Sequence, residues 1–241
     1  MEADEYRRMA EVEETHWWYR STRALLRQLL EPVTTPGGRF LDAGGGTGAT
    51  GGWLAERGTS ITADFEPMAL IANRDLHPRT AGFVGADIAR LPFADGSFDA
   101  VVCVTVLYHD AVADPVAVVR ELMRVTAPGG VVCLWEPGVR RLRRAHDRVT
   151  HGARRFSLRD LRTVAEQAGL RVERATGAYS FLVPPAAVKA VMERGRSTSD
   201  LDRHQDGLGN TLGRVAAVER AVIRRVSLPA GLSVVVVARR P

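Results

Sequence analysis

A glycine-rich segment at residues 42–48 has the composition of a ligand-binding loop. Asp42 opens the segment, and Gly44, Gly46 and Gly48 follow at alternate positions, which makes the pattern D-x-G-x-G-x-G. Glycine has no side chain, so the backbone of such a loop can come close to a bound molecule. Where the loop joins a strand to a helix, it lies at the kind of crevice in which α/β proteins bind small molecules.

Two kinds of cofactor are compatible with these glycines. Gly46, Gly48 and Gly51 also satisfy G-x-G-x-x-G, and Asp64 lies near the ~20-residue offset at which dinucleotide sites carry a ribose-binding acid. Asp42 argues against a dinucleotide, because a carboxylate at a strand end would repel a pyrophosphate and would attract ammonium and sulfonium groups. The register also differs, since the G-x-G-x-x-G pattern starts several residues after the strand ends.

Three further motifs follow the loop in order. They are Gly-Ala-Asp-Ile at residues 85–88, Leu-Pro-Phe-Ala-Asp-Gly-Ser-Phe-Asp at residues 91–99 and Arg-Glu-Leu-Met-Arg-Val-Thr-Ala-Pro-Gly-Gly at residues 120–130. Together with the loop, they resemble the class I methyltransferases that depend on S-adenosylmethionine (SAM), over about residues 38–136. The resemblance implies an enzyme that transfers a methyl group from SAM and releases S-adenosylhomocysteine (SAH).

The resemblance also assigns residues to the methionine end of the cofactor. Asp42 and the backbone at Ala43, Gly44 and Gly46 would hold this end, and the backbone at Val104 would face its ammonium group. Gly45 is a departure, because such loops often carry a larger residue there.

The nucleoside end is assigned in the same way. The Asp64 carboxylate would accept the two ribose hydroxyls, and Phe65 would flank the adenine. Asp87 would accept a hydrogen bond from the adenine amino group, and Ile88 would offer its backbone N–H. The alternative for each acid is an ordinary cap or turn.

His109 is the first candidate for a catalytic base. It falls just past the fourth predicted strand, where cofactor and substrate meet in this architecture. Methyl transfer is an in-line displacement that depends mainly on alignment, so a base is needed only where the nucleophile must lose a proton. The alternative for His109 is a packing or hydrogen-bonding role, and Tyr108 beside it is predicted to contact the substrate or to form its wall.

A second group of polar residues lies after the fifth predicted strand, in an insertion at residues 137–156. His151 is the second candidate base, and His146, Arg154 and Arg155 are predicted to bind substrate, because guanidinium groups pair with carboxylates or phosphates. The insertion would then cap an anionic acceptor. The alternative is a solvated basic loop.

An aromatic cluster, His-Trp-Trp-Tyr, occupies residues 16–19 of the N-terminal segment. Trp18 and Tyr19 are predicted to contact the substrate by closing over the sulfonium or stacking on an aromatic acceptor. The alternative is that the cluster forms the buried face of a helix.

The elements that would position these residues alternate along the chain. Strands are predicted at residues 39–42, 60–64, 82–86, 98–106, 130–136, 170–179 and 232–238. Helices are predicted at 6–30, 47–56, 67–74, 115–126, from Ser157 to before Gly169, and in segments across 186–225, with residues 128–130 as a helix stop. The prediction is a Rossmann-like, doubly wound α/β domain at residues 36–241. It would hold a mostly parallel seven-stranded sheet with helices on both faces, behind an N-terminal helical lid at residues 1–35.

Composition excludes several classes of protein. The net charge of +5 comes from 32 Arg and one Lys, which indicates coding bias more than a polyanionic partner. The acidic start is unlike a signal peptide, and no apolar run approaches the ~20 residues that span a bilayer. Cys103 and Cys133 lie in apolar runs, as buried thiols of a reducing compartment do. We expect a cytoplasmic protein with no membrane span, no metal and no nucleic-acid partner.

The leading hypothesis is a small-molecule methyltransferase acting on O, N or C, in specialised, natural-product metabolism. A quinone-type C-methyltransferase shares the motif at residues 91–93 and its surroundings, and a SAM-binding protein that does not methylate is a further alternative. Nucleic-acid methylation is disfavoured because no Asn/Asp-Pro-Pro-aromatic motif follows the fourth strand. The oligomeric state is not readable from the sequence.

Overall fold

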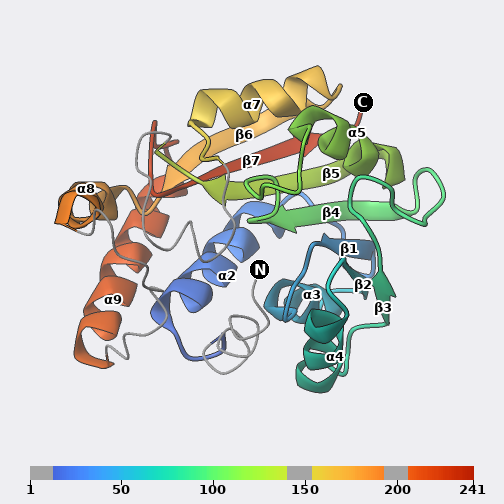
Figure 1. Ribbon diagram of the computed structural model, residues 1–241, viewed down its shortest axis with the longest axis horizontal. Helices are drawn as coiled ribbons and strands as arrows, with labels where there is room; N and C mark the ends of the chain where they lie inside the picture. Colours follow the sequence, from blue (N-terminus) through green and yellow to red (C-terminus); the bar gives the residue numbers. More distant parts are fainter. Residues whose placement is uncertain (1–12, 140–153, 193–205) are drawn as a thin grey trace.

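The computed structural model describes residues 13–139, 154–192 and 206–241, and it contains one seven-stranded sheet (Figure 1). The strand order is β3-β2-β1-β4-β5-β7-β6. The strands are β1 (Arg39–Ala43), β2 (Thr59–Asp64), β3 (Gly82–Gly85), β4 (Phe98–Val104), β5 (Thr126–Pro137), β6 (Arg171–Ala178) and β7 (Ser233–Arg239).

Strands β1 to β5 pair in parallel, and β7 is antiparallel to both β5 and β6. The chain moves outward from β1 through β2 to β3, then returns to start β4 on the other side of β1. The order therefore reverses between β1 and β4, and ligands of open α/β sheets bind at the carboxyl ends of strands at such a point. The predicted doubly wound, mostly parallel sheet is confirmed.

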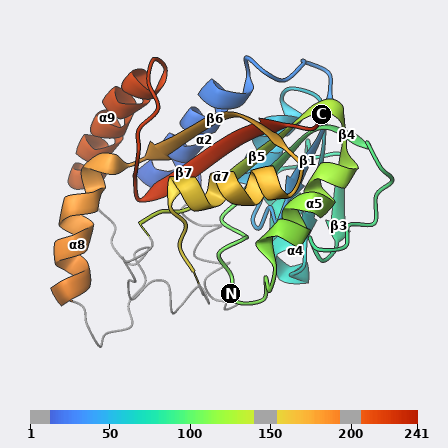
Figure 2. The same ribbon diagram turned by 90° about the horizontal axis from the view of Figure 1, so that it is seen from above.

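Helices cover both faces of the sheet (Figures 1 and 2). Helices α5 (Pro115–Val125) and α7 (Leu158–Gln167) pack on one face. Helices α2 (Trp17–Leu30), α3 (Ala49–Ala55) and α9 (Asp206–Ile223) pack on the other, with α4 (Pro67–Leu76) beside α3. A 3-10 turn, η1 (Ser180–Leu182), leads into α8 (Val183–Met192).

The Val-rich strands explain why both faces are covered. Successive side chains of a strand point to opposite faces, so a strand with helices on both sides needs apolar residues at nearly every position. In β7, Val234 and Val236 face the cluster under α5 and α7, whereas Val235 and Val237 face the cluster under α2, α3 and α9. Cys103 and Cys133 are buried free thiols, as predicted.

Two predicted boundaries were wrong. Helix α2 begins at Trp17, because His16 caps it by accepting a hydrogen bond from the Trp18 N–H, and residues 13–16, which were predicted to be helical, form a turn and a bend. Helix α5 ends at Val125, within one residue of the prediction, but β5 starts directly after it and not at the predicted residue 130. The Thr126 hydroxyl donates to the Leu122 carbonyl at 2.7 Å, and the chain turns extended at Thr126 to start β5.

Candidate cofactor and substrate site

The glycine loop after β1 has a backbone that side chains would not allow. Gly44, Gly46 and Gly48 have φ of 72°, 53° and 98°, a left-handed conformation that favours glycine. A Cβ at Gly44 would lie 2.4 Å from a methyl carbon of Val106, and one at Gly48 would lie 2.1 Å from the amide carbon of Asn73. The glycines therefore allow the turn after β4 and helix α4 to press directly against the loop.

Asp42 lies in β1 with its side chain buried beneath this loop. Its Oδ2 accepts a hydrogen bond from the Gly51 N–H in α3 at 2.8 Å, while Oδ1 is buried without a hydrogen-bond partner in the described part of the chain. Burial raises the pKa of Asp42 to about 7. The hydrogen bond from the Gly51 N–H lowers the pKa, whereas the nearby carboxylates of Glu13 and Asp64 contribute to raising it. An uncompensated buried carboxylate of this kind favours a cationic ligand over an anionic one.

Asp64 ends β2 and is held in a fixed orientation. Its Oδ2 accepts from the Gly46 N–H at 2.8 Å, and its Oδ1 accepts from the Glu66 N–H at 2.9 Å. Burial raises the pKa of this carboxyl group, and the two N–H donors oppose the shift. The next residue, Phe65, is 80% exposed, so an apolar ring without cover lies beside the acid. A ligand with hydroxyls next to a flat ring would match both groups.

Asp87 and Ile88 lie in the loop after β3, next to the end of β2. The Asp64 carbonyl accepts from the Ala86 N–H at 3.0 Å, which ties this loop to the residue predicted to bind ribose. The exposed Asp87 carboxylate accepts from the Ala89 N–H at 2.8 Å, and Ile88 is buried. The predicted nucleoside contacts therefore come from two neighbouring strand ends.

The turn after β4 carries Tyr108 and His109. Val104 ends β4, and Thr105 follows with a φ of 54°. Tyr108 is nearly fully buried, and its ring centroid lies 4.2 Å from that of the half-buried His109. Val106 of the same turn faces Gly44, so the turn that carries His109 adjoins the glycine loop.

The predicted substrate residues of the insertion are only partly described. Arg154 donates to the carbonyls of Leu107 at 3.4 Å and Val112 at 2.6 Å, so its guanidinium group bonds to the turn after β4. Arg155 donates to the Gly138 carbonyl at 3.1 Å. His146 and His151 lie outside the described residues. Substrate binding by these four residues stays a prediction.

The aromatic cluster packs partly against the core. The rings of Trp17 and Trp18 lie 5.8 and 6.4 Å from that of Tyr179, and Trp18 lies 4.9 Å from Tyr19. Trp17 and Trp18 adjoin the cluster under α2, α3 and α9 and are half-buried. The packing against Tyr179 and the core accounts for the partial burial of Trp17 and Trp18. Substrate contact by Trp18 and Tyr19 stays a prediction.

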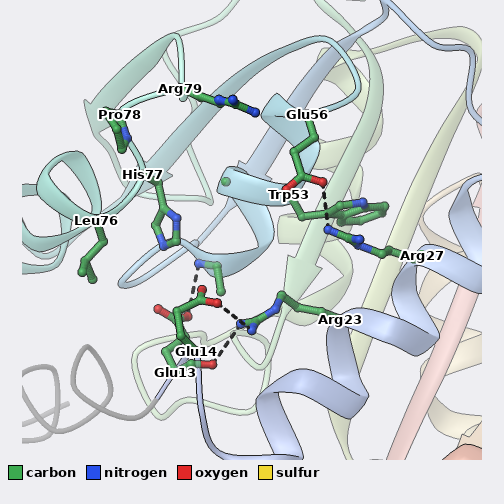
Figure 3. A pocket seen from close by; sticks show the side chains of 12 residues that line it. Glu13, Glu14, Arg23, Arg27, Trp53, Glu56, Leu76, His77, Pro78 and Arg79 are labelled. Atoms are coloured by element: carbon green, nitrogen blue, oxygen red, sulfur yellow. Dashed lines mark hydrogen bonds and ion pairs between the residues drawn. The ribbon is translucent and has the colours of Figure 1, made fainter.

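Glu13 is a residue of this region that sequence reasoning missed. Its carboxylate accepts from the Thr47 hydroxyl at 2.7 Å and from the Ala49 N–H at 3.2 Å, at the start of α3. Arg23 of α2 donates to the Glu13 carbonyl at 3.0 Å and to the Glu14 carboxylate (Figure 3). Burial raises the pKa of Glu13 to about 7, and the Thr47 and Ala49 bonds oppose this. No motif surrounds Glu13, so nothing in the sequence marks it.

The N-terminal turn also forms one wall of a cavity of about 390 Å³ between α2, α3 and the residues after α4 (Figure 3). Among the residues that the structure describes, no three His, Cys, Asp or Glu side chains are grouped as metal ligands. Within the same residues, no helix has the length and apolar composition needed to cross a bilayer.

Comparison with known proteins identifies a methyltransferase domain in this chain. Residues 41–134 match the family model described as a methyltransferase domain. A demethylmenaquinone methyltransferase from Beutenbergia cavernae is 43% identical over 102 residues, which are 42% of this chain and 41% of that one. The match therefore spans less than half of that relative's length.

Solved structures with the same fold cover nearly the whole chain. A chain in the complex between the Haloferax volcanii Trm112 methyltransferase activator and a methyltransferase has a TM-score of 0.65 and 21% identity, covering 99% of this chain and 95% of that one. The [4+2]-cyclase SpnF has a TM-score of 0.61 and 22% identity, and the match covers 92% of this chain and 81% of the SpnF chain. At such identities, the likeness concerns the fold.

Proposed function

We propose, given that residues 41–134 form a class I SAM-dependent methyltransferase domain, that the protein transfers the methyl group of SAM to a small-molecule acceptor. The observation that carries the proposal is the pair of acids around the glycine loop. Asp42 keeps one buried carboxylate oxygen without a partner in the described structure, and Asp64 is oriented by the Gly46 N–H. A ligand that is cationic at one end and bears a ribose at the other suits both.

The described residues fit this cofactor. Asp42 and the backbone of the glycine loop would hold its methionine end, Asp64 would accept the ribose hydroxyls, and Phe65 would cover the adenine. Bound SAM supplies a methyl group on a sulfonium, which is an electrophile. The protein's own contribution is to orient the acceptor in line with that methyl group, which can supply ~7–11 kcal/mol of the barrier reduction.

The acceptor is proposed to be a small molecule methylated on O, N or C, as in natural-product metabolism. A quinone-type ring methylated on carbon is the second candidate, and the 43% identity to a demethylmenaquinone methyltransferase favours it. Tyr108, His109 and the residues after β5 would line the acceptor side. In this scheme, His109 removes a proton where the acceptor must lose one.

The N-terminal segment is proposed to act as a lid. Glu13 supports this, because it bonds to Thr47 and Ala49 at the start of the helix that follows the glycine loop. Arg23 fixes the same turn to α2. The segment at residues 137–156 is proposed to close the acceptor side.

Binding and turnover test the proposal separately. Calorimetry with SAM, SAH and NAD should show binding of the first two and none of NAD. Release of SAH should then be screened with SAM against phenols, carboxylated aromatics and a demethylmenaquinone analogue. Binding of NAD in preference to SAM would overturn the cofactor assignment. Because a cyclase shares the fold, SAM binding without SAH release from any acceptor class would favour a protein that does not methylate.

A further inference from the structure

Glu136 is a buried acid that, within the described structure, accepts hydrogen bonds from the turn that carries His109. It lies in β5, and its side chain is fully inaccessible to solvent. Its Oε1 accepts from the N–H groups of Val106 at 3.1 Å and Leu107 at 2.8 Å, and its Oε2 accepts from that of Tyr108 at 3.2 Å. Three successive backbone donors thus point at one carboxylate.

The backbone before these donors is in an unfavourable conformation. Thr105 has a φ of 54°, which a β-branched residue rarely adopts, and its N–H donates to the Trp135 carbonyl at 2.6 Å. Such a conformation persists only where the surroundings impose it. The turn reverses here and aims its next three N–H groups at β5, so the Glu136 carboxylate compensates the strain at Thr105.

Arg154 bonds to the carbonyl groups of the same turn. Its guanidinium donates to Leu107 and Val112, and its own N–H donates to the Tyr108 carbonyl at 3.3 Å. Leu107 is therefore held by its N–H through Glu136 and by its carbonyl through Arg154. An acid and a base of opposite charge fix the segment on both sides of His109.

The bonding pattern requires Glu136 to act as an acceptor at both oxygens. Burial raises the pKa of Glu136 to about 8, and the three N–H donors and the Arg154 charge oppose that shift. A protonated carboxyl group would have to donate from one oxygen, and its described neighbours here are donors. The ionised form is the one that fits the turn.

We propose that Glu136 and Arg154 are positioning residues that hold the turn at residues 105–112 in the conformation that presents Tyr108 and His109 to the acceptor. This inference rests on the proposed function for the identity of the reaction, but the position of the turn is measurable without any substrate. Neither residue is proposed to touch the reacting atoms.

The test compares Glu136→Gln with a matched control in the same chain. Glu219 of α9 also accepts from three successive backbone N–H groups, those of Tyr179, Ser180 and Phe181, and Tyr179 has a φ of 57°. Glu219→Gln therefore makes the same change, one acceptor oxygen replaced by an NH2 donor, at a half-buried acid whose turn does not carry His109. Both variants are measured by thermal unfolding, by calorimetry with SAM and by the NMR resonance of the His109 Cε1–H.

The expected result is a moved His109 resonance and a kcat reduced at least tenfold in Glu136→Gln, with the Kd for SAM changed less than threefold. Glu219→Gln should leave the His109 resonance in place, because its turn does not contain that residue, and any loss of thermal stability in it shows what such a change costs away from His109. A folded Glu136→Gln protein with an unmoved resonance would overturn the proposal, whatever its turnover.

A second variant covers the case in which Glu136→Gln does not fold. Arg154→Met keeps the Glu136 carboxylate and removes the bonds to the carbonyls of Leu107 and Val112. The His109 resonance should move in this variant, in the absence of substrate. An unmoved resonance in Arg154→Met would count against the proposal in the same way. Because these spectra are recorded without an acceptor, they test the position of the turn even if the screen for methyl transfer finds no acceptor.

Discussion

The carboxylate of Asp64 accepts a hydrogen bond from the backbone N–H of Gly46 at 2.8 Å, which joins the end of β2 to the glycine loop after β1. The second oxygen accepts from the Glu66 N–H, so the carboxylate group cannot rotate freely. A carboxylate has about four lone-pair directions, and two N–H donors leave room for two hydroxyl donors. The acid is thus preorganised for a diol by bonds within the protein.

Removal of Asp64 and Asp87 together should abolish SAM binding. Each carboxylate would make a charge-assisted hydrogen bond worth about 1.5–3 kcal/mol, so each single Ala variant should weaken binding by roughly 10- to 150-fold. Asp75→Ala is the control, because Asp75 is exposed on α4 and pairs only with Arg74 in the described structure. Calorimetry measures the Kd. If the folded double variant kept its affinity for SAM, the assignment of Asp64 and Asp87 to the cofactor site would be wrong.

The affinity for SAM should depend on pH through Asp42. Binding a cation favours the ionised carboxylate, and burial raises its pKa from 3.8 to about 7, so protons compete with the ligand below that pH. The Kd should rise by up to tenfold for each pH unit below about 7 and level off above it. The same shift means that Asp42 stabilises the fold most below its ordinary pKa, and that this contribution is lost as the pH rises through 7.

Variants separate the contribution of Asp42 from that of Glu13, whose pKa is also raised to about 7 by burial. Asp42→Asn should bind SAM more weakly at pH 8 and show a flatter profile, whereas Glu13→Gln should keep the part of the profile that belongs to Asp42. Calorimetric Kd values from pH 5.5 to 8.5 decide this. An unchanged profile in Asp42→Asn would assign the titration to another group.

Gly48→Ala should destabilise the protein. Its φ is 98°, and the new Cβ would lie 2.1 Å from Asn73, whose amide donates to the Gly46 carbonyl. Strain and displacement of Asn73 should each cost about 1–3 kcal/mol. Gly85→Ala is the control, since its Cβ would meet nothing within 4 Å, and it should stay within about 0.5 kcal/mol of the parent. Urea unfolding gives both values. Equal stability of the two variants would contradict the close contact between the loop and α4.

His109→Ala should keep SAM affinity and lose turnover. A general base contributes ~10²–10⁴ in rate, so a loss of that size identifies a proton acceptor, and a loss below tenfold identifies packing. His151→Ala is measured in parallel, because the sequence places both histidines near the acceptor. If the His109 variant is fully active with an acceptor that must lose a proton, His109 is not the base.

The position of the cofactor site in the fold could be predicted from the sequence, because parallel strands place their carboxyl ends at one edge of the sheet. Asp64 ends one strand that was predicted from the sequence and Asp87 follows the next, so their proximity was expected from the order of those strands. Glu136 was missed because it ends an apolar run thirty residues after its partners, and no local pattern shows which turn a buried side chain reaches. The start of β5 was placed four residues late, at 130, because the Pro-Gly-Gly at residues 128–130 suggests a break, whereas the chain is already extended at Thr126.

The contact between Gly44 and Val106 makes the size of the site adjustable. The three nearest atoms to a Cβ at Gly44 all belong to the Val106 side chain, so at this point the wall is set by two methyl groups and not by main chain. Val106→Ala would remove both without altering the N–H that Glu136 accepts. We expect the Val106→Ala variant to bind synthetic sulfonium cofactors with added bulk at the amino-acid end more tightly than the parent protein does.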